Sequence, residues 1–171
     1  MKSIVIYSSL TGNTKQVAEA ITSVLPAGTP CVSMKEVPSD LSSYDLVFAG
    51  FWVDKGTANK EARDVLGILH NPHIALFATA GVPPQMAHAK ESLINAANCL
   101  PDGIEPVGTF ICQGKVDPKV IEMMYKMFPK GHSHGQSADR DARHKQAAVH
   151  PNEDDFKAAQ DFAKDILIKL S

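Results

Sequence analysis

Five short runs of apolar and β-branched residues recur along the chain, at 3–8, 30–34, 45–51, 73–80 and 106–113. Each run is nearly continuous and does not alternate between apolar and polar residues. Continuous runs of this length are typical of parallel strands that are covered by helices on both faces. The pattern therefore predicts five buried parallel strands.

Amphipathic helical patterns separate these runs, with apolar stripes at 17–25, 62–69 and 86–97. The clearest helix begins at Asn152, has three acidic residues in its first turn, and carries Phe156, Ala163 and Ile166 on one face. Acidic side chains at a helix N-terminus favour the helix dipole. Strands that alternate with helices predict an α/β fold, a three-layer open five-stranded parallel sheet with right-handed crossovers.

The segment after the fifth run departs from this alternation. Asp117 and Pro118 supply an N-cap and a first-turn proline to a helix that Pro129 stops. Residues 129–151 are rich in Gly, His and charge, lack apolar periodicity, and predict a long loop. We expect one domain over 1–171 with an insertion at about 115–151. The insertion follows the carboxyl end of a strand, so it should lie near the ligand crevice but on the far side of the sheet centre from the first loop.

Composition narrows the class of protein. The 171 residues include 17 Lys and Arg and 19 Asp and Glu, a net charge of −2 that favours neither nucleic acid nor an anionic membrane as partner. The three cysteines are far apart and form no metal-finger motif. The N-terminal run turns polar too early for a signal peptide or a membrane-inserted helix. We expect a cytoplasmic protein.

Candidate chemistry begins directly after the first strand, in Ser8–Thr14. Hydroxyls of Ser9, Thr11 and Thr14, the amide of Asn13 and backbone N–H groups freed by Gly12 would suit a phosphate at a helix N-terminus. The loop contains no Lys or Arg, and it matches neither the nucleoside-triphosphate loop nor the dinucleotide motif. It therefore predicts a neutral cradle for one terminal phosphate.

This loop resembles the phosphate loop of the flavodoxin family, [TS]-x-T-G-x-T, which reads here Ser9-Leu10-Thr11-Gly12-Asn13-Thr14. The likeness extends from Met1 to about Gln113 and includes the final helix. It implies a flavodoxin-like sheet of strand order 2-1-3-4-5 and a non-covalently held FMN. The alternative interpretation of the loop is a plain strand-to-helix turn with a capping hydroxyl.

The resemblance also assigns two further loops to the flavin. The loop at 50–57 would present Trp52, beside Val53 and Gly56, to one face of the ring, with Phe51 either beside it or in the core. The loop after the fourth strand would contact the pyrimidine edge through the backbone of Thr79, Ala80 and Gly81, and it supplies no second aromatic residue. Trp52 could otherwise be a core or surface residue at a strand end.

Departures from the resembled family bear on function. Electron-carrier flavodoxins are often strongly acidic and have Gly after the loop aromatic residue, where Val53 stands here and resists positive φ. Gly56 could take that role in another register. The small size and the lack of a nicotinamide motif favour an FMN-dependent carrier between a reductase and an acceptor redox enzyme. The near-neutral charge, Val53 and the insertion favour a flavodoxin-like oxidoreductase acting on a quinone or tetrapyrrole-type substrate. A flavin-free anion-binding domain is the third hypothesis, and we favour the carrier.

The remaining residues with possible chemistry are explained more simply by structure. Four histidines of the insertion, His132, His134, His144 and His150, lack cysteine partners and fit no closed metal site, so we expect a solvated loop and no metal. No nucleophile or acid–base constellation emerges, so we predict no catalytic residue. The methionines at 123, 124 and 127 are expected to serve packing or to form an apolar patch near the flavin.

Overall fold

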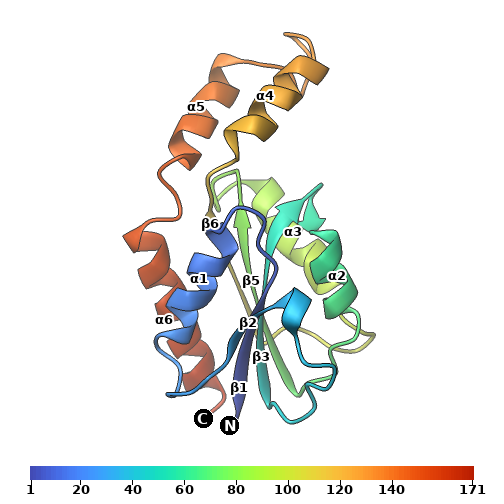
Figure 1. Cartoon of the computed structure of the whole chain (residues 1–171), viewed down its shortest axis with the longest axis vertical. Coiled ribbons are helices and arrows are strands. Elements are labelled where there is room, and N and C mark those ends of the chain that lie inside the picture. Colours follow the sequence, from blue (N-terminus) through green and yellow to red (C-terminus); the bar gives the residue numbers. More distant parts are fainter.

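The computed structural model describes all 171 residues and contains a central parallel sheet. Five strands run in the order β2-β1-β3-β5-β6. Because β4 is not part of this parallel series, the order confirms the predicted sequence 2-1-3-4-5 (Figure 1). The strands are β1 (Ser3–Tyr7), β2 (Cys31–Ser33), β3 (Leu46–Asp54), β5 (His73–Ala80) and β6 (Gly108–Gln113).

The end of β3 differs from the prediction. The expected loop at 50–57 is largely strand, because β3 continues to Asp54 and pairs antiparallel with β4 (Thr57–Ala58). Lys55 and Gly56 form the two-residue connection with φ of 50° and 77°. Positive φ at both positions is what the tight hairpin turn with right-handed twist requires. The sheet therefore has six strands, of which the sequence pattern predicted five.

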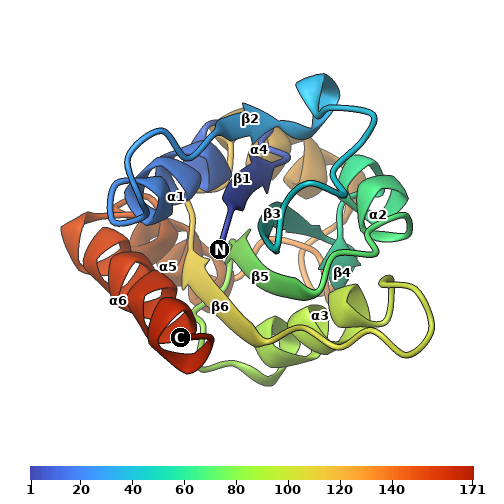
Figure 2. The ribbon, with the colours of Figure 1, turned by 90° about the horizontal axis from the view of Figure 1, so that it is seen from below.

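Helices cover the sheet on both faces, as Figure 2 shows from below. On one face lie α1 (Asn13–Thr22) and α6 (Glu153–Lys169), and on the other lie α2 (Lys60–Leu66) and α3 (Ala87–Ala97). A 3-10 turn, Met34–Glu36, follows β2. Asn152 and Asp155 form a capping box at the start of α6, which explains why this helix is so clear in the sequence.

The side chains of each strand alternate between two hydrophobic cores. In β3, Val47, Ala49 and Phe51 face α2 and α3, while Leu46 and Phe48 face α1 and α6. All five are fully buried. The continuous apolar runs arise from this double coverage, because both faces of every central strand are inside the protein.

The insertion forms a projecting arm, which we define as residues 118–147. It contains α4 (Pro118–Met127) and α5 (Ala138–Ala147) and extends beyond the carboxyl ends of the strands (Figure 1). The predicted loop at 129–151 is therefore wrong for its central part. The sequence of α5 lacks apolar periodicity because this helix buries only Ala147. Its N-terminus is stabilised locally: Ser137 Oγ accepts from the Arg140 N–H at 3.2 Å, and Asp139 and Asp141 lie in the first turn.

The two ends of the arm return to the same place. The N–H of Lys115 donates to the carbonyl oxygen of His150 at 2.8 Å. The arm thus leaves and rejoins the body at one point, where the body means all residues outside 118–147.

None of the helices combines the length and apolarity that crossing a membrane requires.

Candidate functional site

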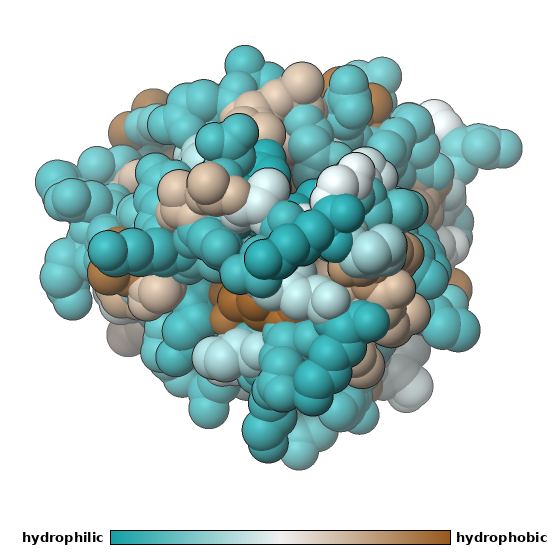
Figure 3. All heavy atoms as spheres, turned by 90° about the horizontal axis from the view of Figure 1, so that it is seen from above, coloured by the Kyte–Doolittle hydropathy of each residue, from teal (hydrophilic) through white to brown (hydrophobic).

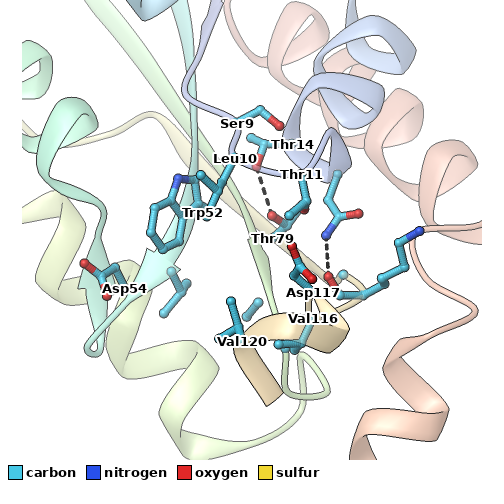
Figure 4. A pocket seen from close by; sticks show the side chains of 16 residues that line it. Ser9, Leu10, Thr11, Thr14, Trp52, Asp54, Thr79, Val116, Asp117 and Val120 are labelled. Carbon is cyan, nitrogen blue, oxygen red and sulfur yellow. Dashed lines mark hydrogen bonds between the residues drawn. The ribbon is translucent and has the colours of Figure 1, made fainter. Parts of the chain in front are cut away.

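A cavity of about 400 Å³ opens at the carboxyl ends of the strands, where the arm leaves the body (Figure 4). Three walls surround it: the loop after β1, the hairpin end of β3 with the end of β5, and the root of the arm. The lining residues are Ser9, Leu10, Thr11, Asn13, Thr14, Trp52, Val53, Asp54, Thr79, Ala80, Gly81, Gly114, Lys115, Val116, Asp117 and Val120.

The first wall ends in an uncapped helix N-terminus. Gly12 takes φ of 94° at the N-cap of α1, where no side chain accepts a hydrogen bond and the first turn holds no acidic residue. The N–H groups of Asn13 and Thr14 donate no hydrogen bond within the chain. The Gly12 N–H donates to Ser9 Oγ at 3.1 Å and so shapes the loop itself. Free N–H groups and the helix dipole make this end of the cavity attractive to an anion.

Two buried threonines form the floor. Thr14 Oγ1 and Thr79 Oγ1 lie 3.0 Å apart and share a hydrogen bond, and both side chains are almost completely buried. This bond ties the first turn of α1 to the end of β5 (Figure 4). Thr14 therefore contributes to the site through its position and backbone, while its hydroxyl is already paired with a protein group.

A second buried hydrogen-bond network supports the loop after β1 from behind. Asn59 Nδ2 donates to Ser8 Oγ at 2.8 Å, and Ser8 Oγ donates to a carboxylate oxygen of Glu61. Ser8 and Asn59 are both buried. Since Ser8 is the first residue of the loop, this network holds the start of the loop against α2.

The hairpin presents Trp52 to the cavity. Trp52 pairs with Thr79 across β3 and β5, and its side chain lies across the cavity from Thr11 (Figure 4). The hairpin tip is fixed from outside, because Asn95 Nδ2 of α3 donates to the Gly56 carbonyl oxygen at 2.8 Å. The large flat indole is thus carried by a braced element and not by a free loop.

The arm root supplies the third wall, and here the predicted position needs correction. The insertion does not start far from the phosphate loop, since Asn13 Nδ2 donates to the Lys115 carbonyl oxygen at 2.9 Å. Gly114 permits this approach, because a Cβ there would lie 2.8 Å from Asn13 Nδ2. Val116 likewise packs over Gly81, where a Cβ would lie 2.7 Å from Val116 Cγ2. These contacts bring the wall after β1 and the wall after β6 together.

Two carbonyl oxygens at the end of β5 and in the loop after it already accept hydrogen bonds from within the chain. The carbonyl oxygen of Ala80 accepts from the Gly114 N–H at 2.8 Å, and that of Gly81 accepts from Gln113 Nε2 at 3.3 Å. These bonds join the ends of β5 and β6. Of this segment, Thr79, Ala80 and Gly81 all line the cavity.

Three residues predicted for the site lie outside the cavity lining. Phe51 is fully buried against α2 and α3, because alternation along β3 turns it away from the side that Trp52 occupies. Gly56 is at the hairpin tip, and Gly12 acts through its backbone at the N-cap. The other predicted residues line the cavity: Ser9, Leu10, Thr11, Asn13, Thr14, Trp52, Val53, Thr79, Ala80 and Gly81.

Sequence analysis missed the six lining residues Asp54, Gly114, Lys115, Val116, Asp117 and Val120. Five of them follow β6, so the rule that ligands bind at the carboxyl ends of parallel strands would have pointed to them. The sequence pattern does not point to Asp54, because it predicts a loop where β3 continues and pairs with β4.

Groups outside the cavity do not form a second reactive centre. No cluster of three or more His, Cys, Asp or Glu side chains is arranged to hold a metal ion. His132 stacks on Phe128 with ring centroids 4.7 Å apart, and His150 Nδ1 lies 2.6 Å from Asp155 Oδ2. Burial raises the pKa of the Cys112 thiol, which disfavours the reactive thiolate.

Known proteins resemble this chain in sequence and in fold. The family model described as "Flavodoxin domain" matches residues 4–164. The flavodoxin-like domain-containing protein BilS of Clostridioides difficile is 36% identical, with 100% of this chain and 99% of that protein covered. Among solved structures, an FMN-bound flavoprotein from Lactobacillus acidophilus has a TM-score of 0.51 at 19% identity, covering 65% of this chain and 93% of its own. An archaeal flavodoxin has a TM-score of 0.52 at 16% identity, covering 99% and 98%. The chain belongs to the flavodoxin domain family, whose cofactor is FMN.

Proposed function

We propose that this protein binds FMN non-covalently in the cavity between Thr11 and Trp52 and carries electrons from a reductase to an acceptor redox enzyme. One observation carries the proposal: an uncapped helix N-terminus and a large aromatic side chain lie on opposite sides of the same cavity. The first suits a phosphate and the second suits a flat conjugated ring.

The phosphate would be held at the start of α1. The free N–H groups of Asn13 and Thr14 and the exposed hydroxyl of Thr11 are the donors that the structure leaves available there. Lys115 is the one basic residue of the lining and adds a positive charge that the loop itself lacks, while the carboxylates of Asp54 and Asp117 also line the cavity. A dianionic phosphate would therefore meet oriented dipoles and one nearby cation.

The ring would lie against Trp52, in a cavity whose volume is within the range of roughly 300–1,000 Å³ that is usual for small-molecule sites. When bound, FMN supplies reversible uptake and release of electrons. Trp52 would contribute apolar contact to one face of the ring. The braced hairpin would keep that contact fixed.

The cavity edge is open, which favours a carrier. Leu10 is 67% exposed and Val120 is 39% exposed, and both residues line the cavity. A partner protein can therefore approach the rim directly. All three cysteines are free, which supports a reducing cytoplasmic setting for this function.

The test is a titration of the purified, flavin-depleted protein with FMN and with riboflavin, followed by flavin absorbance and fluorescence. FMN should bind at least a hundredfold more tightly than riboflavin, because only FMN carries the phosphate. Thr11→Ala should weaken FMN binding about tenfold, since a hydrogen bond to a charged group contributes about 1.5–3 kcal/mol.

Thr29→Ala is the matched control, because its hydroxyl donates to the Pro26 carbonyl oxygen at 2.7 Å, in the turn that leads into β2. It should bind FMN as the parent does. Equal affinity for FMN and riboflavin, or no flavin binding at all, would rule out the proposed site.

A further inference from the structure

The arm carries an apolar stripe that nothing in the chain covers. Val120, Met123 and Met127 are 39%, 57% and 66% exposed, and the spacing of three and four residues places them on one side of α4. α4 buries none of its side chains. Since Val120 also lines the cavity, the stripe starts at the cavity and runs outward for about 10 Å along the helix.

The arm is also positively charged, unlike the body. It contains six Lys and Arg against three Asp and Glu, a net charge of +3. The body contains eleven basic and sixteen acidic residues, a net charge of −5. The overall charge of −2 therefore hides two regions of opposite sign.

Most of the arm's positive charge is available to a partner. Only Lys126 forms an ion pair within the chain, with Glu122 at 2.7 Å. Of the arm's carboxylates, Asp141 accepts a hydrogen bond from Tyr125 Oη at 2.8 Å, which joins α4 to α5, and another from Gln136 Nε2 at 3.0 Å. The other five basic side chains have no carboxylate partner within 4 Å.

The apolar stripe and the charges lie next to each other. Lys119 and Lys126 are four residues before and three residues after Met123, so both flank the stripe on the helix surface. Figure 3, which looks down on this end of the molecule, shows mostly hydrophilic residues with apolar patches confined between them. A small apolar centre with a charged rim is the usual composition of a protein interface.

We infer that the exposed face of α4 is the docking surface for an acidic redox protein, which it positions over the cavity rim. That the partner is a redox protein rests on the proposed function. Charge complementarity selects the partner: an acidic surface is attracted to the arm and repelled by the body, so it approaches at the end where the cavity opens. Methionines suit such a transient contact because their flexible side chains adapt to different surfaces.

Two other occupants are less well supported. A membrane-binding helix would have large apolar anchors beside its basic residues, whereas this stripe holds two methionines and a valine, and Glu122 shares the polar face. A second copy could place its acidic body on the arm, but such a head-to-tail contact does not close and would produce chains of molecules.

The first experiment measures docking without any redox step. Zinc-substituted plastocyanin, an acidic protein, is added to the ¹⁵N-labelled protein, and amide shifts are followed by NMR at low and at physiological salt. We expect shifts to concentrate at 115–130 and to weaken at higher salt. Shifts that concentrate on the body, or that are absent at low salt, would overturn the inference.

The second experiment uses variants with matched controls. Lys119→Glu with Lys130→Glu should weaken plastocyanin binding about tenfold, and Met123→Gln with Met127→Gln should weaken it about fivefold. The controls carry the same changes on the body: Lys35→Glu with Lys90→Glu, and Ile94→Gln with Ile168→Gln, where the lysines are exposed and unpaired and the isoleucines are 61% and 74% exposed. Controls should change binding less than twofold. Equal effects of arm and body variants would contradict the inference.

The third experiment adds the redox step with the FMN-loaded, chemically reduced protein and copper plastocyanin. One electron passes from the reduced protein to Cu(II), which becomes Cu(I), and stopped-flow absorbance follows the copper. The arm variants should lower the second-order rate constant about as much as they lower binding. Failure to load FMN refutes the proposed function, while the NMR result still decides the docking surface.

Analytical ultracentrifugation and cosedimentation with phosphatidylserine vesicles test the two other occupants. Self-association or vesicle binding that the arm variants abolish would assign the exposed face of α4 to a second copy or to a membrane instead.

Discussion

The body and the arm of this protein are built on opposite principles. The body buries two hydrophobic cores, one on each face of the sheet, and carries a net negative charge. The arm buries only Gly135 and Ala147, exposes two methionines of α4, and is net positive. The body's sequence is therefore constrained by its own stability, whereas the exposed apolar and charged residues of the arm contribute little to folding and remain free for contacts with other molecules.

The cavity lies where these two regions meet. Its first two walls belong to the body, and its third wall starts with Gly114 and ends at Val120 on the arm. Changes on the two sides should therefore have different consequences, which four predictions make measurable.

The largest difference concerns stability. Phe77→Ala should lower the free energy of unfolding by about 3–5 kcal/mol, because Phe77 is fully buried and its ring packs directly over Gly50. Met127→Ala, on the arm, should change it by less than about 0.5 kcal/mol. Urea unfolding followed by circular dichroism measures both. A cost above about 1 kcal/mol for Met127→Ala would show that the arm is part of the cooperative core.

The next difference concerns the cavity walls. Trp52→Ala should weaken FMN binding about ten- to a hundredfold, equivalent to about 1.4–2.8 kcal/mol, whereas Val120→Ala on the arm should weaken it less than about threefold. Because Trp52 is the only tryptophan, FMN binding to the parent protein should also quench its fluorescence. Unchanged emission on binding would place the ring away from Trp52.

A third experiment removes the arm. Replacing residues 118–148 by a Gly-Ser-Gly link should leave a folded protein, since the 2.8 Å bond between the Lys115 N–H and the His150 carbonyl shows that the ends already meet. Thermal melting should shift by only a few degrees, and the FMN dissociation constant should stay within about threefold of the parent value. Loss of FMN binding would make the arm part of the cofactor site.

The smallest effect is a pH dependence confined to the arm. Burial lowers the pKa of His144 below its ordinary 6.5, and both ring nitrogens are buried without a hydrogen-bond partner. Because the unfolded arm takes up a proton more readily than the packed one, the contribution of His144 to stability is complete above about pH 6.5 and is lost as the pH falls toward the lowered value. Amide hydrogen exchange should therefore show less protection in α5 at about pH 5.5 than at about pH 7.5.

The control for this pH effect is His134→Phe, which changes an exposed histidine and should keep the pH dependence. His144→Phe should remove the pH dependence, since a phenylalanine ring can take the place of the His144 ring beside Tyr125 but cannot take up a proton. Equal pH responses in α5 and in the body helix α6 would show that His144 is not the responsible group.

The sequence pattern by itself determined the five parallel strands, the helices between them and the loop after β1, whereas the order of the strands came from the resemblance to flavodoxins. The first six residues of β3 are buried and therefore apolar without alternation, and α6 starts with a complete capping box, so both signals are local and strong. The hydroxyl-rich loop before α1 was equally readable, because its residues are adjacent in the chain.

Only the tertiary structure decided three other features. The hairpin at Lys55 and Gly56 forms because α3 braces its tip through Asn95, a residue almost forty positions away. α5 has no apolar stripe, since it buries only Ala147 and is held by its caps and by contacts with α4 such as the hydrogen bond from Tyr125 to Asp141. The third wall of the cavity joins the first because the Asn13 side chain, at the start of α1, donates to the Lys115 carbonyl oxygen after β6. Contacts between distant segments depend on how helices and strands pack, and no local pattern of residues encodes that packing.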